Sequence, residues 1–168
     1  MEPKIITLPA LKVAGYKINT SNINGTNLKE IPAFWTAYME DGRMEKLHGA
    51  DFVKNHAEYG VCFSTNSGKG GFSYVIGVEV KEDVEIPNDF YACELPDATY
   101  AMFSTVPSDR TEFSSNIQKT WHYIMNDWFP SSGYEYAKGK VDFELYGEQS
   151  RGDSGLVCEI YIPIAKIK

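Results

Sequence analysis

One pattern of elements occurs twice along the chain, and this repeat constrains the fold more than any other feature. Each half contains an extended stretch, a helical stretch and two strand-like runs. The ranges are 5–18, 27–39, 59–65 and 72–80 in the first half, and 91–105, 111–128, 140–146 and 156–164 in the second. A short sequence motif recurs as well, since both extended stretches contain Leu-Pro, at Leu8-Pro9 and Leu95-Pro96. Chance similarity between strand-rich segments is the alternative explanation.

If the repeat is real, residues 1–168 form one domain of two β-α-β-β units, with 1–85 as the first half and 86–168 as the second. Each amphipathic helix would cover one face of its strands. The fold class predicted from this arrangement is α+β, an antiparallel sheet with helices on one side.

The second helix is the better defined. Its apolar stripe recurs every three or four residues and consists of Phe113, Ile117, Trp121, Ile124, Met125 and Trp128. Asp109 and Glu112 form a capping pair at its start, and Pro130 is expected to stop it. The first helix must accommodate Pro32 in its first turn, and the polar residues 41–58 after it predict a loop. Glycine-rich turns are expected at 66–71 and 147–155.

Charge and composition limit the partners. Sixteen basic and 23 acidic side chains give a net charge of −7, which disfavours direct binding of nucleic acid. The longest apolar runs fall short of about 18 residues, so we expect no membrane span. Three well-separated cysteines and the absence of an apolar leader after Met1 predict a cytoplasmic protein.

Several kinds of chemistry have no support in the sequence. His48, His56 and His122 show no spacing that converges metal ligands, so no metal site and no cofactor are expected. The run 67–71 lacks the spacing of a phosphate-binding loop, and no nucleophile elbow is present.

The last hairpin has a more informative pattern. Strand alternation places Glu144 and Tyr146 on one face of the first strand, and Glu159 and Tyr161 on one face of the second. We expect the two glutamates to lie near each other across the hairpin. Because 14% of the residues are aromatic, these carboxylates can lie among aromatic rings, an arrangement that suits a lipophilic cation. The alternative is that these residues form the wet side of a half-exposed sheet.

Several motifs together resemble the GyrI-like family, the effector-binding domain that is also fused to AraC-type and MerR-type multidrug-responsive regulators. The resemblance covers essentially the whole chain. The motifs are Trp35, the run 72–80, Trp128-Phe-Pro-Ser-Ser-Gly-Tyr134, Phe143-Glu-Leu-Tyr146 and Cys158-Glu-Ile-Tyr-Ile-Pro-Ile164.

The resemblance implies two units related by a pseudo-twofold axis, with a ligand cleft between the halves. It also implies recognition of amphipathic, often cationic, aromatic compounds by an acidic residue in an aromatic pocket. The acidic candidates are Glu144 and Glu159, the latter followed by Tyr161. The candidate pocket walls are Trp35, Tyr74, Phe103 and Trp121, although the helix stripe gives Trp121 a packing role as well.

Three functions follow. The first is a stand-alone small-molecule binding protein that senses or sequesters drugs or toxins; with no helix-turn-helix segment or basic stripe, it would regulate transcription only through another polypeptide. The second, which the resemblance suggests, is a hydrolase of cyclopropane-containing genotoxins. In that case Glu144 would activate water, and Tyr146 or Tyr161 would donate to the developing oxyanion. The third is an inhibitory or adaptor protein for DNA gyrase or a regulator. Monomer and homodimer both remain open.

Overall fold

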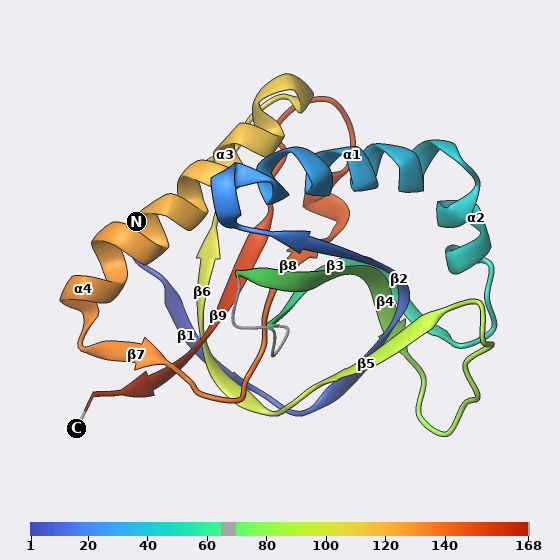
Figure 1. Cartoon of the computed structure of the whole chain (residues 1–168), viewed down its shortest axis with the longest axis horizontal. Helices are drawn as coiled ribbons and strands as arrows, with labels where there is room; N and C mark the ends of the chain where they lie inside the picture. The colour runs from blue at the N-terminus through green and yellow to red at the C-terminus, as the bar shows by residue number, and fades with distance from the viewer. Residues whose placement is uncertain (65–69, 168) are drawn as a thin grey trace. The chain divides into compact units, whose positions relative to one another are not determined.

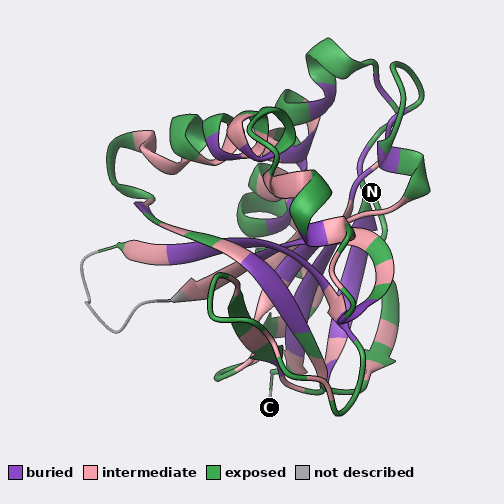
Figure 2. Cartoon of the chain, turned by 90° about the vertical axis from the view of Figure 1, so that its right-hand side faces the viewer, coloured by how far each residue is buried: buried purple, intermediate pink, exposed green. Residues whose placement is uncertain are grey.

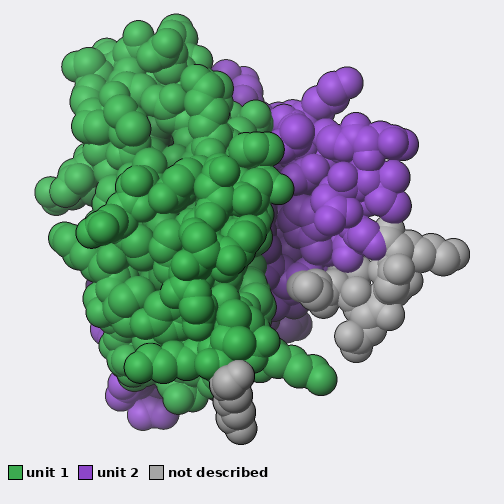
Figure 3. Space-filling view, turned by 90° about the vertical axis from the view of Figure 1, so that its left-hand side faces the viewer, with its two compact units in different colours: residues 1–10, 96–168 green, residues 11–95 purple. Residues whose placement is uncertain are grey.

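The computed structural model describes residues 1–64 and 70–167, apart from the side chain of residue 64. The chain forms two compact units, shown in separate colours in Figure 3. The terminal unit contains Met1–Ala10 and Pro96–Lys168, and the central unit contains Leu11–Leu95. The predicted turn at 66–71 lies mostly outside the described residues.

The central unit is an antiparallel sheet in the order β3-β4-β2-β5 with two helices. Its elements are β2 (Leu11–Ser21), η1 (Ile23–Gly25), α1 (Asn27–Glu40), α2 (Arg43–His48), β3 (Val53–Ser64), β4 (Gly71–Val80) and β5 (Tyr91–Leu95). Phe34 and Tyr38 of α1 and Leu47 of α2 pack on one face of the sheet, against residues that include Tyr74 and Ile76 of β4. Figure 2 shows buried residues on one side of the helices and exposed residues on the other.

The terminal unit is an antiparallel sheet in the order β1-β6-β9-β8, with β7 paired to β9 (Figure 1). Its elements are β1 (Lys4–Leu8), β6 (Ala98–Ser104), α3 (Arg110–Tyr123), the π-helical η2 (Ile124–Trp128), α4 (Phe129–Ser132), β7 (Tyr134–Tyr136), β8 (Asp142–Tyr146), η3 (Glu148–Ser150) and β9 (Glu159–Lys166). Phe113 and Ile117 of α3 pack against Phe103, Ile160 and Ile162 of the sheet. The predicted α+β class, with helices on one side of antiparallel strands, is confirmed in each unit.

The Leu-Pro repeats mark the places where the chain passes from one unit to the other. β1 ends at Leu8 and pairs with β6, whereas β5 ends at Leu95 and pairs with β2. Pro9 and Pro96 follow these strand ends, because proline has no N–H to continue a ladder. The boundaries of the two units therefore differ from a division of the chain at residue 85. Residues 1–10 precede that division but belong to the terminal unit, and residues 86–95 follow it but belong to the central unit.

Two local expectations need correction, and one strand was missed. Pro130 does not stop the second helical run, because it lies in the first turn of α4, where a missing N–H costs nothing. The run ends at Gly133, whose φ of 74° is readily adopted only by glycine. The region 41–58 is not a loop, since it forms α2 and the first part of β3. The strand β7 was not predicted.

Candidate functional site

Glu144 lies in the middle of β8 and is only 6% exposed. It pairs across the ladder with Ile160 of β9, which belongs to the core beneath α3. Side chains of directly paired residues share a face, so Glu144 points toward the helix side of the terminal unit. The alternative of a wet sheet face is therefore wrong for this residue.

Each carboxylate oxygen of Glu144 accepts a hydrogen bond from an aromatic side chain. The Trp121 indole of α3 donates from Nε1 to Oε1 at 2.7 Å, and the Tyr146 hydroxyl donates to Oε2 at 2.8 Å. The Tyr146 ring is held by an edge contact with Phe113, with centroids 6.2 Å apart. We call Glu144, Trp121 and Tyr146 the Glu144 cluster.

The chemistry of the Glu144 cluster follows from its donors. A carboxyl group that accepts on both oxygens is arranged as an ionised carboxylate. Burial of such a charge is costly, and the two charge-assisted hydrogen bonds offset part of that cost. Neither donor is a cation, so these bonds leave the negative charge in place. The neighbouring Cys158 responds to this environment, because burial and then the charge of Glu144 hold the pKa of its thiol well above the usual range.

Glu159 and Tyr161 lie on the opposite face of the same sheet. The Tyr161 hydroxyl donates to Glu159 at 2.8 Å, and the Tyr161 ring stacks on Phe143 with centroids 4.5 Å apart. Tyr100 completes this aromatic group with edge contacts to both rings. The ladder pairs Glu159 with Leu145 rather than with Glu144. The expectation that the two glutamates lie together is therefore wrong, because adjacent positions in a strand point to opposite faces.

The other candidate wall residues divide into two groups. In the central unit, the Trp35 indole donates to the Tyr74 hydroxyl at 2.9 Å, so these two candidates do lie together. In the terminal unit, Phe103 is 0% exposed and its ring packs against Trp128, with centroids 5.1 Å apart. This burial indicates a packing role for Phe103.

Sequence reasoning missed a second buried carboxylate. Glu58 of β3 is 8% exposed, and its Oε1 lies 2.7 Å from Nε2 of His48. The short helix α2 brings His48 to this strand, and treating 41–58 as a loop concealed it. The flanking Gly42 and Gly49 were signals of a short helix in that region. Within the described residues, no group of three or more His, Cys, Asp or Glu side chains is placed to hold a metal ion.

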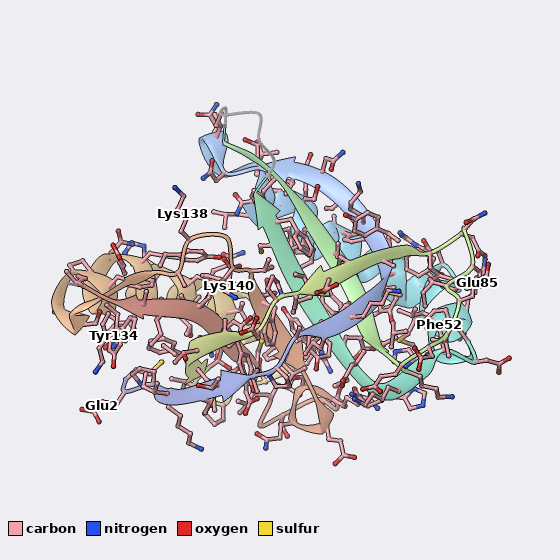
Figure 4. All side chains as sticks on the ribbon, turned by 90° about the horizontal axis from the view of Figure 1, so that it is seen from below. Glu2, Phe52, Glu85, Tyr134, Lys138 and Lys140 are labelled. Atoms are coloured by element: carbon pink, nitrogen blue, oxygen red, sulfur yellow. The ribbon has the colours of Figure 1, made fainter. Side chains whose placement is uncertain are left out.

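A shallow hollow of about 490 Å³ lies in the central unit, on the side where Figure 4 labels Phe52 and Glu85. Its lining contains none of the candidate residues and consists of Gly49, Ala50, Asp51, Phe52, Val84, Glu85 and Pro87. In the described part of the chain, no helix is both long and apolar enough to cross a bilayer.

The match to a family profile identifies the chain as an effector-binding domain. The sequence profile of Cass2, the integron-associated effector-binding proteins, matches residues 4–164. The chain belongs to this GyrI-like family, as the motifs predicted.

Two relatives carry names that indicate regulation. The transcriptional regulator BrlR of Pseudomonas aeruginosa is 27% identical over 166 residues, which are 98% of this chain and 56% of BrlR. A DNA gyrase inhibitor of Erwinia billingiae is 32% identical over 95 residues, which are 55% of this chain and 56% of the inhibitor. The chain thus matches little more than half the length of either relative.

Solved structures support the fold. SAV2435 bound to tetraphenylphosphonium superposes with a TM-score of 0.77 at 20% identity, over 98% of this chain and 94% of that one. The integron cassette protein VCH_CASS2, from the mobile metagenome of Vibrio cholerae, gives a TM-score of 0.60 at 15% identity, over 98% and 96%.

Proposed function

We propose that this protein binds amphipathic, cationic aromatic compounds and that Glu144 is the group that recognises their positive charge. The observation that carries the proposal is the burial of Glu144 with an uncharged donor on each oxygen. The ligand in the SAV2435 structure, tetraphenylphosphonium, belongs to the same chemical class. We further propose that binding serves to sense or sequester such compounds, as an accessory to a transcription regulator, a role suggested by the similarity to BrlR.

The cluster suits a cation that has no hydrogen atoms to donate. Both oxygens of Glu144 already have a donor, so a ligand need not supply one. Charge attraction is strong where water is excluded. The indole of Trp121 and the phenol of Tyr146 add aromatic faces, which attract cations through the ring quadrupole. A quaternary ammonium or phosphonium group carried by aromatic rings combines these properties.

Titration of the intrinsic tryptophan fluorescence with tetraphenylphosphonium tests this proposal. We expect saturable binding by the native protein. In Glu144→Gln the affinity should fall by about 2–5 kcal/mol, the usual cost of removing one member of a buried charge pair, or roughly 30-fold to several thousandfold. Triphenylphosphine oxide, a neutral aromatic compound, should bind weakly and equally to both proteins. Equal affinity of the two proteins for the phosphonium ion would rule out Glu144 as the recognition group.

Glu159→Gln is the matched control. It makes the same chemical change in the neighbouring strand, on the opposite face of the same sheet. If the Glu144 cluster is the site, this variant should bind tetraphenylphosphonium as the native protein does. A loss confined to Glu159→Gln would instead assign recognition to Glu159, Tyr161 and the aromatic group around them.

A second candidate is inhibition of DNA gyrase, which the similarity to the Erwinia billingiae inhibitor favours. A gyrase supercoiling assay with the purified protein tests it. Inhibition that persists unchanged in Glu144→Gln would indicate a protein-binding role separate from the Glu144 cluster. Unimpaired supercoiling at a large molar excess of the protein would exclude this candidate.

A further inference from the structure

The hollow of about 490 Å³ in the central unit lies outside the Glu144 cluster, and we call it the Phe52 hollow. Two chain segments contribute to its lining, 49–52 between α2 and β3 and 81–90 between β4 and β5. Hydrogen bonds tie these segments together. The backbone N–H of Lys81 donates to the Phe52 carbonyl at 2.9 Å, and the Lys81 ammonium donates to the Asp51 carbonyl at 2.7 Å. Contacts within the chain therefore shape the Phe52 hollow.

Apolar groups form much of the lining. The Phe52 ring is 3% exposed and makes an edge contact with Phe90, with centroids 5.1 Å apart. Val84 and Ala50 are half-buried and pack against the core of the central unit, and Pro87 adds an apolar ring to the lining. A concave surface with an apolar lining is suited to receive an apolar side chain.

Acidic side chains surround these apolar groups. Asp51 and Glu85 belong to the lining, one from each segment, and both are exposed (Figure 4 labels Glu85 beside Phe52). Glu82 and Asp83 are exposed in the same segment as Glu85. Among the described residues, none of these four carboxylates has a hydrogen-bond or ion-pair partner. The Lys81 ammonium is the one cation of the two segments, so negative charge is in excess there.

Two lysines of the adjoining elements are already paired elsewhere. Lys46 of α2 forms an ion pair with Asp89, and Lys54 of β3 forms one with Glu79 at 2.8 Å. Their charges are balanced by these partners, so they leave the excess negative charge of the Phe52 hollow in place.

We propose that the Phe52 hollow docks a basic segment of a partner protein, which places an apolar side chain over Phe52 and lysine or arginine side chains beside Asp51 and Glu85. Complementary charge speeds the encounter and selects for basic partners. The long apolar stems of lysine and arginine can pack along the apolar lining while their charged ends stay in water. The proposal does not rest on ligand binding by Glu144, which lies in the terminal unit.

The exposure of the carboxylates favours a segment with several charges over a small cation. An exposed ion pair contributes little, because water and salt screen it. A single charge therefore binds weakly, whereas several charges on one chain act together. A second copy of this protein, with its net charge of −7, is repelled, and so is nucleic acid.

NMR titration of the backbone amides with the peptide acetyl-Lys-Arg-Phe-Arg-Lys-amide tests the proposal. We expect saturable shift changes at residues 50–52 and 84–85, with an affinity that falls at high salt. The same peptide with glycine in place of phenylalanine should bind more weakly, and equal binding of the two peptides would refute the role of the apolar lining. Unchanged shifts at these residues with millimolar peptide would overturn the proposal.

Two double variants separate the Phe52 hollow from a general effect of charge. Asp51→Asn with Glu85→Gln should weaken peptide binding at least about threefold, through the loss of two exposed ion pairs. Glu148→Gln with Asp153→Asn makes the same two chemical changes at exposed positions of the terminal unit and should keep the native affinity. Equal affinities of the two double variants would overturn the proposal. Glu144→Gln should bind the peptide as the native protein does, so this test and the test of the Glu144 cluster can fail separately.

Other occupants of the Phe52 hollow give different results. If tetraphenylphosphonium shifts the same amides as tightly as the peptide, the hollow receives small cations and the proposal is wrong. The proposal is also wrong if the native protein sediments as a dimer and Asp51→Asn with Glu85→Gln sediments as a monomer, because the occupant is then a second copy.

Discussion

Tyr146→Phe removes one hydrogen bond from Glu144, together with the contact of the same hydroxyl with the Cys158 thiol. The edge contact of the ring with Phe113 remains, and only the hydroxyl that donates to Oε2 at 2.8 Å is lost. Glu144 is 6% exposed, so water has little access to replace the donor. A hydrogen bond to a buried charged group contributes about 1.5–3 kcal/mol. With about 2–4 °C per kcal/mol for a chain of this size, 2 kcal/mol lowers Tm by about 4–8 °C.

Tyr161→Phe is the control for this prediction. It removes the same hydroxyl, two residues after a glutamate and also at 2.8 Å from the carboxylate, but on the opposite face of the sheet. Glu159 is half-buried rather than buried, so water can take the place of the lost donor. Urea unfolding monitored by circular dichroism should show a loss for Tyr146→Phe that exceeds the loss for Tyr161→Phe. Equal losses, or the reverse order, would refute the argument that burial makes the hydrogen bonds of Glu144 energetically special.

Three further predictions concern other parts of the fold. Burial raises the pKa of the Cys93 thiol to about 12, so at pH 8 a disulfide reagent should label Cys93 about a thousandfold more slowly than a free thiol. Burial also holds the pKa of the Cys158 thiol well above its usual range, so Cys158 should be labelled more slowly than a free thiol as well. Labelling of either cysteine at the free-thiol rate in the folded protein would contradict this. Hydrogen bonds from the first turn of α3 lower the pKa of Asp109. The stabilising effect of this carboxylate is therefore present above the ordinary value of about 3.9 and is lost as the pH falls through the lower, folded value. Asp109→Ala should lower the urea midpoint more at pH 7 than at pH 2, and midpoints equal to the native ones at pH 7 would contradict the capping role. In Gly15→Ala the new Cβ would lie 2.0 Å from the Ile76 carbonyl oxygen, so β2 and β4 must separate. The free energy of unfolding, measured with urea, should fall by at least about 1–3 kcal/mol. Native stability in this variant would contradict the close approach of the two strands.

The sequence predicted what depends on neighbouring residues and missed what depends on register. Alternation correctly placed Tyr146 with Glu144 and Tyr161 with Glu159, and both pairs form hydrogen bonds. The relation between the two pairs depends on how β8 aligns with β9 across residues 147–158, and no local pattern fixes that alignment. A shift of one residue moves a side chain to the other face, so the alternation pattern of each strand did not determine whether the two glutamates share a face.

The same distinction explains the helices. Asp109 caps α3 as predicted, because a capping bond joins residues two or three apart. The end of the helical run was misplaced, because proline breaks a helix only in the helix interior. The π-helical turn at 124–128 ends just before α4 begins, so Pro130 lies in the first turn of α4. The irregular segment of β3 that carries His56 was missed for a similar reason, since its polar residues have partners that are distant in sequence. His56 contacts His48 of α2, and Lys54 and Asn55 donate to Glu79 of β4.

The polar pattern of β8 is best explained by burial of both its faces. Phe143 points to the face where Tyr161 stacks, and Glu144 points to the face beneath α3, yet both are nearly inaccessible to solvent. A leucine at position 144 would gain hydrophobic burial without the desolvation cost of a charge, and replacing buried charges by apolar groups is often neutral or stabilising. The donors from Trp121 and Tyr146 reduce the cost of the carboxylate but add no positive charge to balance it. A carboxylate kept at this position despite its desolvation cost is what the proposed recognition of a cationic ligand by Glu144 would require.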